Sequence, residues 1–291
     1  MTPVDARAPA DVTTAFVLSG GASHGAVQVG MLQALAEHGV RPDLVFGASA
    51  GALNAAWIAG DPTLRHLDQL ADVWTALRTR DIFPLRPLMG LLGFLGRRNS
   101  LVPPDGVRAL VARNLTFERL EDAPIPLCVV ATEVTSGREV AMTTGPALDA
   151  IVASASIPGV LPPVQMGEHL LMDGGVVNNT PISNAIDAGA TRIYVLPTGY
   201  ACDLRHPPKS ALAMSLQAIS LLVQQRLIID VHDLQARVDL RVLPPVCPLD
   251  VSPTDFSHAR ALIDLAREGA SQWLDASGLE RHSGELNLHR H

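Results

Sequence analysis

Cysteine, aromatic residues and charge are scarce in this chain of 291 residues, and each shortage excludes a class of protein. The three cysteines are odd in number and lack the spacing of metal ligands, which favours a reducing compartment over a disulfide framework and predicts no metal site. Charged residues make up 18% of the chain, and the net charge is -7. Nucleic-acid binding needs clustered Lys and Arg, and the densest cationic point is only Arg97-Arg98, so we expect no nucleic-acid partner.

Long apolar runs are missing too, although 47% of the residues are hydrophobic. No stretch reaches the roughly 18 apolar residues that a membrane-spanning helix needs. The first residues carry Asp5, Arg7 and Asp11 and lack the apolar core of a secretory signal. We therefore expect a cytoplasmic protein. Because aromatic residues make up only 4% of the chain, its core must be packed with Ala, Val, Leu and Ile.

Apolar runs alternate with helical patterns in the first 60 residues. Short runs at 15–18 and 44–46 are each followed by a glycine-rich turn and then by a helical pattern, at 26–37 and 50–59. This β-α-β-α order predicts an α/β fold with parallel strands and crossover helices. Further strands are expected at 127–131, 139–142, 170–172, 192–196 and 238–243, and further helices at 147–156, 179–188, 210–235 and 258–273.

No internal repeat or long linker divides the chain, so we expect a single domain over residues 14–277. A flexible arm is expected at residues 1–13 and a loose tail at residues 278–291. Residues 84–96 stand out because PLRPLMGLLGFLG is apolar but interrupted by proline and glycine. This segment predicts either a buried connection over the core or a mobile flap that contacts a membrane beside the site.

A serine turn follows the second predicted strand. Gly47-Ala48-Ser49-Ala50-Gly51 matches the nucleophile-elbow pattern, in which a serine occupies a sharp strand-to-helix turn. The flanking positions must be small because neighbouring strands crowd such a turn, and all four neighbours of Ser49 are glycine or alanine. The following helix directs the positive end of its dipole towards the hydroxyl. The alternative is a tight turn whose serine only caps the helix.

A glycine-rich turn, Gly20-Gly21-Ala22-Ser23-His24-Gly25, follows the first predicted strand. Backbone N–H groups in such a turn can bind a phosphate, but the dinucleotide-binding pattern requires glycine where this chain has Ala22. The same N–H groups, near Gly21 and Ala22, could instead bind the oxyanion of an acyl-transfer reaction. Close packing of the turn on the sheet is the third interpretation.

A third turn, Asp173-Gly174-Gly175, follows the predicted strand at 170–172. A serine nucleophile needs a base, and none of the ten histidines follows a buried strand in a tight turn. Asp173 is better placed, because the two glycines let the chain turn sharply and the carboxylate point inward. Burial would raise its pKa and make it a stronger base. The alternative is an aspartate that only stabilises its own turn.

These three turns, in this order, resemble the patatin-like phospholipase family over residues 14–200. Further matching blocks lie at residues 131–134, 153–158, 161–163 and 173–181. The resemblance implies a three-layer α/β/α fold with a mostly parallel central sheet. It also implies a serine–aspartate dyad, with Ser49 as the nucleophile and Asp173 as the base. By the same resemblance, Gly20, Gly21 and Ala22 line the oxyanion hole, and Gly25, Gly47, Gly51, Gly174 and Gly175 are motif glycines.

Two positions depart from that family pattern: Ala22 replaces a glycine, and His24 stands where Arg or Lys is common. We assign His24 no role. The leading hypothesis is a hydrolase of lipid carboxyl esters, of phospholipase A or lysophospholipase type, that works through an acyl-enzyme without metal or cofactor. A lipid or ester substrate and peripheral membrane contact follow from it. The alternatives are a catalytically silent lipid-binding protein and an acyl transferase.

Overall fold

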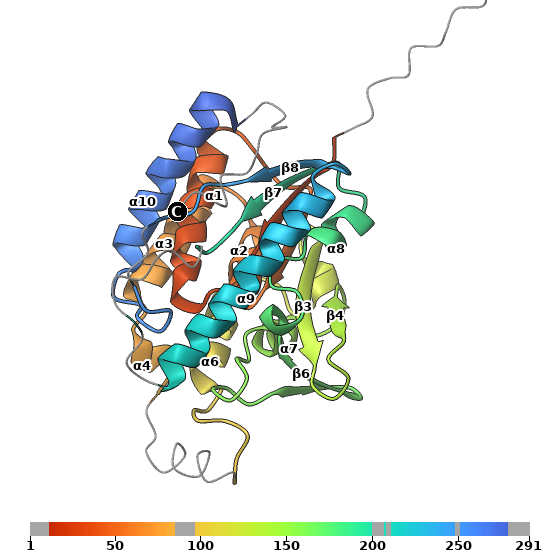
Figure 1. Cartoon of the computed structure of the whole chain (residues 1–291), viewed down its shortest axis with the longest axis vertical. Helices are drawn as coiled ribbons and strands as arrows, with labels where there is room; N and C mark the ends of the chain where they lie inside the picture. The colour runs from red at the N-terminus through yellow and green to blue at the C-terminus, as the bar shows by residue number, and fades with distance from the viewer. Residues whose placement is uncertain (1–11, 85–96, 200–206, 208–210, 248–250, 279–291) are drawn as a thin grey trace, which may run out of the picture.

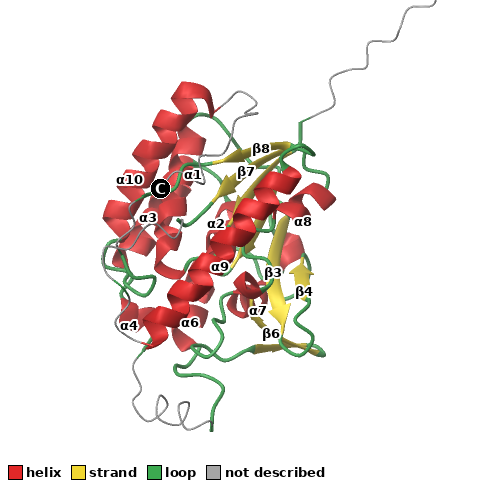
Figure 2. Cartoon of the chain, viewed as in Figure 1, coloured by secondary structure: helices red, strands yellow, loops and turns green. Residues whose placement is uncertain are grey.

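The computed structural model describes residues 12–84, 97–199, 207, 211–247 and 251–278. Within these residues the chain forms one mixed sheet with helices on both faces (Figures 1 and 2). The predicted three-layer α/β/α fold is therefore confirmed. The expectations for the N-terminal arm, the flap at 84–96 and the C-terminal tail fall almost entirely outside the described residues.

The sheet has the strand order β5-β6-β3-β2-β1-β7-β8, with β4 paired to β3. Five neighbouring strands run parallel: β1 (Thr14–Leu18), β2 (Leu44–Ala48), β3 (Leu127–Glu133), β7 (Arg192–Leu196) and β8 (Asp239–Val242). The antiparallel strands at one end are β4 (Glu139–Met142), β5 (Val164–Met166) and β6 (His169–Asp173). The parallel strands form nearly continuous apolar runs because helices cover both of their faces.

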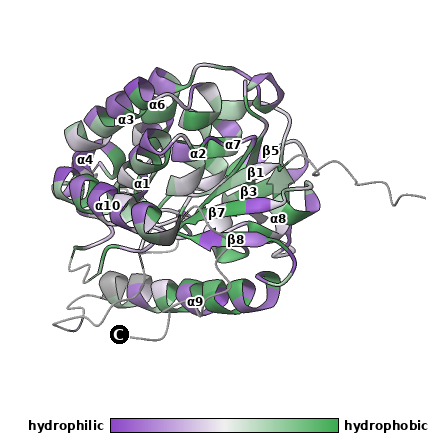
Figure 3. Cartoon of the chain, turned by 90° about the horizontal axis from the view of Figure 1, so that it is seen from above, coloured by the Kyte–Doolittle hydropathy of each residue, from purple (hydrophilic) through white to green (hydrophobic). Residues whose placement is uncertain are grey.

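Most helices lie on one face of the sheet, and α8 and α9 lie on the other (Figure 3). The larger layer contains α1 (Gly25–Glu37), α2 (Ala50–Gly60), α3 (Leu64–Ala76), α4 (Thr79–Ile82), α6 (Asp105–Asn114), α7 (Ala147–Ser154) and α10 (Ala259–Trp273). The smaller layer contains α8 (Ile182–Asp187) and α9 (Ala211–Leu234). Side chains alternate between the two layers: in β1, Phe16 and Leu18 join the larger core, whereas Ala15 and Val17 join the smaller one.

Several features of the fold were not predicted, among them α4, α6 and β5. The sequence analysis missed α3, although Leu67, Leu70 and Trp74 recur at helical spacing and are buried. It was also wrong about the cysteines, because Cys247 is disulfide-bonded while Cys128 is a buried free thiol. Bridging depends on how close two Cα atoms lie after folding, which neither the number nor the spacing of cysteines encodes. Cysteine content therefore no longer favours a reducing compartment.

The C-terminal helix α10 is part of the larger core, because it packs closely against α1 at Gly30. A Cβ atom at Gly30 would overlap the carbonyl oxygen of Ile263 and approach the backbone of Arg267. Ala266 and Ala270, on the same helix, are also buried. The absence of a side chain at Gly30 therefore sets the distance between the first and last helices of the described chain.

This contact predicts opposite effects for two glycine substitutions. Gly30→Ala should lower the free energy of unfolding by about 1–3 kcal/mol, because the helices must separate to accept the methyl group. Gly269→Ala is the matched control within α10, since a Cβ there meets no atom within 4 Å. It should raise stability by about 0.5–1 kcal/mol through helix propensity. Urea unfolding measures both; a stabilised Gly30→Ala variant would contradict the packing account.

Candidate active site

Strand register brings Ser49 and Asp173 to the same position on the sheet. Ala48, the last residue of β2, pairs with Val130 of β3, and the next residue of β3, Ala131, pairs with Asp173 of β6. Ser49 directly follows Ala48, so the serine and the aspartate lie on either side of Ala131. Two turns that are 124 residues apart in sequence therefore meet at one point.

The turn at Ser49 has the strained geometry of a nucleophile elbow. Ser49 has φ 55° and ψ -125°, and Ala22 is the other non-glycine residue with positive φ in the described part of the chain. This backbone region costs a non-glycine residue about 1–3 kcal/mol, so the surrounding packing must hold it. A Cβ at Gly51 would overlap the carbonyl of Leu18. Gly20, Gly25, Gly47, Gly174 and Gly175 likewise have no room for a Cβ.

Ser49 and Asp173 are in direct hydrogen-bond contact. The Ser49 hydroxyl donates to Oδ2 of Asp173 over 2.7 Å, and both residues are buried. The hydroxyl makes no capping bond to α2, which excludes the interpretation of Ser49 as a simple helix cap. Oδ1 of Asp173 accepts the N–H of Gly175 over 2.7 Å. Asp173 thus stabilises its own turn with one oxygen and contacts Ser49 with the other.

Neighbouring polar groups hold both turns in place. The Ser154 hydroxyl accepts the backbone N–H of Ser49 over 2.9 Å and donates to the carbonyl of Val130 over 2.6 Å. The Thr132 hydroxyl donates to the carbonyl of Asp173 over 2.8 Å. These bonds anchor the serine turn and the aspartate turn to the same strand, β3. The sequence analysis assigned neither residue a role, although Thr132 and Ser154 lie in the family-matching blocks at 131–134 and 153–158.

Burial shifts the protonation of Asp173. Removal from water raises the pKa of its carboxyl group to about 6, and the hydrogen bonds from Ser49 and Gly175 oppose that rise. The carboxylate is therefore ionised at neutral pH but binds a proton more readily than an exposed aspartate. A base of this kind suits the removal of a proton from a hydroxyl.

The glycine-rich turn presents two unpaired N–H groups at the site. The N–H of Gly20 donates to the carbonyl of Asn179 over 3.2 Å. Those of Gly21 and Ala22 have no hydrogen-bond partner within the described residues. Gly20 itself faces the serine, because a Cβ there would lie 2.8 Å from Cβ of Ser49. Of the three residues expected to line an oxyanion hole, Gly21 and Ala22 have N–H groups without a partner among the described residues, and Gly20 leaves room for the side chain of Ser49.

Side chains distant in sequence orient that turn. The hydroxyl of Thr198 donates to the carbonyl of Gly20 over 2.7 Å, and its backbone N–H donates to the Ser19 hydroxyl over 3.0 Å. The amide of Gln28, fully buried in α1, donates to the carbonyl of Ser19 over 2.8 Å. These contacts satisfy the carbonyl groups of Ser19 and Gly20 and hold the turn in place. The sequence analysis assigned Thr198 and Gln28 no role, since neither lies in a recognisable motif.

His24 lies half-buried in the glycine-rich turn. Burial lowers the pKa of His24, so the ring is neutral at neutral pH, and its Nε2 lies 2.9 Å from the carbonyl of Val251. His24 therefore supplies no positive charge in place of the Arg or Lys that the family pattern favours. Among the described residues, no group of His, Cys, Asp or Glu could hold a metal ion.

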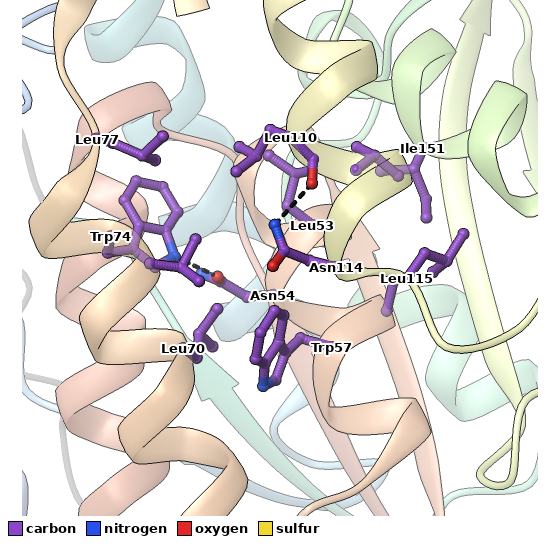
Figure 4. Close-up of a pocket in the computed structure, with 13 residues that line it drawn as sticks. Leu53, Asn54, Trp57, Leu70, Trp74, Leu77, Leu110, Asn114, Leu115 and Ile151 are labelled. Carbon is purple, nitrogen blue, oxygen red and sulfur yellow. Dashed lines mark hydrogen bonds between the residues drawn. The ribbon is translucent and has the colours of Figure 1, made fainter. Parts of the chain in front are cut away.

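An apolar groove of about 40 Å³ runs along the outer side of α2, the helix that begins at Ser49 (Figure 4). It is lined by Leu53, Asn54, Ala56, Trp57, Leu70, Val73, Trp74, Leu77, Leu110, Val111, Asn114, Leu115 and Ile151. The two asparagines do not make it polar: Asn54 accepts from Nε1 of Trp74 over 2.9 Å, and Asn114 donates to the carbonyl of Leu110 over 2.7 Å. The groove therefore suits an apolar ligand. The sequence analysis did not predict it, because four helices contribute to it.

The buried charge predicts that Asp173→Asn stabilises the fold. Because the folded-state pKa lies above its ordinary value of 3.8, the ionised form costs up to about 3 kcal/mol at about pH 8. Asparagine removes that cost. As the pH falls from about 6 towards about 4, protonation of Asp173 removes the same cost from the wild type. The difference in the free energy of unfolding between the variant and the wild type should therefore shrink over that window. Chemical denaturation at both ends tests this; a variant less stable than wild type at about pH 8 would contradict it.

Comparison with known proteins places this chain in a family. The family model of the patatin-like phospholipases matches residues 16–186. The patatin-like phospholipase domain-containing protein 7 of Rattus norvegicus is 29% identical over 187 residues, which are 64% of this chain and 13% of that protein. An uncharacterized NTE family protein of Mycobacterium bovis is 32% identical over 178 residues, 61% of this chain and 46% of that protein.

A solved structure has the same fold. Human GIVD cytosolic phospholipase A2, in complex with methyl gamma-linolenyl fluorophosphonate, superposes with a TM-score of 0.50 at 12% identity, covering 91% of this chain and 57% of that one. The chain spans less than half the length of the two curated relatives above. Because the family model covers more than half of the chain, this protein belongs to the patatin-like phospholipase family.

Proposed function

We propose that this protein hydrolyses carboxyl esters of lipids through a Ser49–Asp173 dyad and an acyl-enzyme. One observation carries the proposal: the hydroxyl of a serine in a strained elbow donates over 2.7 Å to a buried carboxylate. The raised pKa of Asp173 supports its role as the base, because a carboxylate with an ordinary pKa accepts a proton from serine only weakly.

Acylation begins when Oδ2 of Asp173 accepts the hydroxyl proton of Ser49. The serine oxygen then bonds to the carbonyl carbon of the ester, and the carbonyl oxygen becomes an oxyanion. The N–H groups of Gly21 and Ala22 donate to that oxyanion, and the N-terminal end of α2 adds favourable electrostatic potential. When the carbon–oxygen bond to the alcohol breaks, Asp173 returns its proton to the departing oxygen.

Deacylation repeats these steps with water. Asp173 takes a proton from a water molecule, whose oxygen attacks the carbonyl carbon of the acyl-enzyme. The same N–H donors hold the second oxyanion. The bond from carbon to the Ser49 oxygen then breaks, and the serine recovers a proton from Asp173. The fatty acid leaves, and the dyad returns to its starting state without a cofactor.

The groove beside α2 is proposed to hold the acyl chain. Leu53 lies four residues after Ser49, so it sits one helical turn, or about 6 Å, from the serine along α2. Ile151 lies three residues before Ser154, which binds the N–H of Ser49. Both helices therefore extend from the site into the groove. An acyl chain lying there would replace water against leucine and tryptophan side chains.

The dyad predicts loss of turnover in two variants. Ser49→Ala should lower kcat/KM for p-nitrophenyl butyrate by at least about 1,000-fold, because no nucleophile remains. Asp173→Asn should lower it by at least about 100-fold, because the amide accepts no proton. Asp149→Asn is the matched control, since Asp149 of α7 is a half-exposed carboxylate paired with Arg108 of α6. Near-normal turnover in either dyad variant would refute the mechanism.

The groove predicts a change in chain-length preference. Leu110→Trp should fill the groove and lower kcat/KM for p-nitrophenyl palmitate by about tenfold, while the butyrate ester is little affected. Arg113→Trp, at an exposed position on the same helix, is the control and should alter neither rate. An equal loss on both esters in Leu110→Trp would show that the groove supports the fold rather than the acyl chain.

A further inference from the structure

The helix α9 is much longer than the strands it connects. It is the crossover between β7 and β8, two parallel neighbours in the sheet. Its 24 residues extend about 36 Å, whereas the five residues of β7 extend only about 17 Å. The C-terminal half of α9 packs on the sheet, because Leu227 and Val231 are buried in the smaller core. The N-terminal half has no strand of matching length beneath it (Figure 1).

That N-terminal half lies near the carboxyl ends of the parallel strands, the same edge of the sheet that bears the candidate site. The helix runs antiparallel to β7, so it starts from the carboxyl end of that strand. At this end Leu196 of β7 pairs with Leu18 of β1, the residue before the glycine-rich turn. Thr198, two residues further on, donates to Gly20. The start of α9 and the proposed oxyanion hole therefore belong to the same edge of the molecule.

Large apolar side chains on α9 are exposed to solvent. Of nine exposed large hydrophobic residues within the described chain, five lie on this helix, so the exposure is concentrated there. They are Met214, Ile219, Leu221, Leu222 and Ile229, and Leu222 has 71% of its surface exposed. Leu222 and Ile229, seven residues apart, lie on the side of the helix opposite to Leu227 and Val231, and Met214 and Leu221 lie at the margin of that side. The helix thus carries apolar side chains on both sides, and the described residues of the chain cover one of them.

The charge pattern indicates what covers the other side. From Ala211 to Gln225 the helix carries no Asp, Glu, Lys or Arg. Acidic residues would be costly against a bilayer, and basic residues would select anionic lipids. The uncharged stretch therefore suits insertion at the surface of zwitterionic lipid. Within the described residues no helix is long and apolar enough to cross a membrane, so the helix would lie in the interface.

We propose that residues 214–222 of α9 form an interfacial surface that docks on zwitterionic lipid and brings the edge bearing Ser49 against it. The inference rests on the proposed function, because a lipid ester resides in such a surface. This surface is separate from the membrane flap expected at residues 84–96, and it is formed by exposed side chains of α9. Leu222 is its central anchor, and Met214 and Leu221 flank it on the same side of the helix.

The test measures vesicle binding without turnover. In the Ser49→Ala background, co-flotation with phosphatidylcholine vesicles is compared for Leu222→Asp and Leu265→Asp. Leu265 is the matched control, being 54% exposed on α10, on the other face of the sheet (Figure 3). Leu222→Asp should weaken the partition coefficient at least about tenfold, as expected for losing one buried leucine. Leu265→Asp should change it less than about twofold. With Ser49 intact, both variants should hydrolyse p-nitrophenyl butyrate normally, which shows that the fold is intact.

Three outcomes would overturn the proposal. The first is equal vesicle binding by Leu222→Asp and Leu265→Asp. The second is binding that requires anionic lipid, which would place the contact on cationic residues elsewhere. The third is a wild-type dimer in light scattering that Leu222→Asp converts to a monomer without changing vesicle affinity, so that a second copy covers the helix. Failure of the dyad itself would appear only as absent ester hydrolysis and would leave vesicle binding unchanged.

Discussion

The hydrogen bond between Ser49 and Asp173 depends on the register of three strands. The serine leaves the end of β2, the aspartate ends β6, and β3 lies between them and pairs with both. A slip of β6 by one residue would turn the carboxylate to the opposite face of the sheet. Ser154 and Thr132 hold the two turns to β3, so the 2.7 Å contact results from the whole sheet rather than from either turn.

This arrangement lowers stability at the site. The buried carboxylate would be more stable protonated, and Ser49 and Ala22 both occupy a backbone region that favours glycine. The two cores on either side of the sheet offset these terms, and the close α1–α10 contact through Gly30 completes the larger core. A base that is ionised yet weakly stabilised, next to a hydroxyl with one orientation, is what nucleophilic attack needs.

The start of the fold was predictable because β1 and β2 are apolar runs that are each followed by a glycine-rich turn and a helical pattern. The three turns identified Ser49, Asp173 and residues 20–22 as candidate site residues. The structure places these residues together. The antiparallel pairing of β6 to β3 was not predictable, since periodicity carries no pairing information. Thr198 and Gln28 gave no local signal, because their partners lie 178 and 9 residues away and their roles arise only after folding. Ala22 has a φ of 49°, which alanine rarely adopts, so its residue type argued against the backbone conformation that the structure shows.

Location explains how the proposals fit together. The elbow, the unpaired N–H groups and the start of α9 share one edge of the sheet, and the apolar groove begins one turn below the serine. A lipid could enter from an interface at α9, place its ester beside Ser49 and lay its acyl chain along α2. The smaller helical layer then carries the surface contact, and the larger layer carries the acyl chain.

The rate at which a fluorophosphonate probe labels Ser49 tests the central claim most directly, with the labelled residue identified by mass spectrometry. The account predicts modification of Ser49 alone, with a rate that rises with pH through an apparent pKa near about 6, the value that burial gives Asp173. In Asp173→Asn the labelling should be slow and independent of pH in that range. Labelling of another residue, or rapid labelling of Ser49 in Asp173→Asn, would contradict the account.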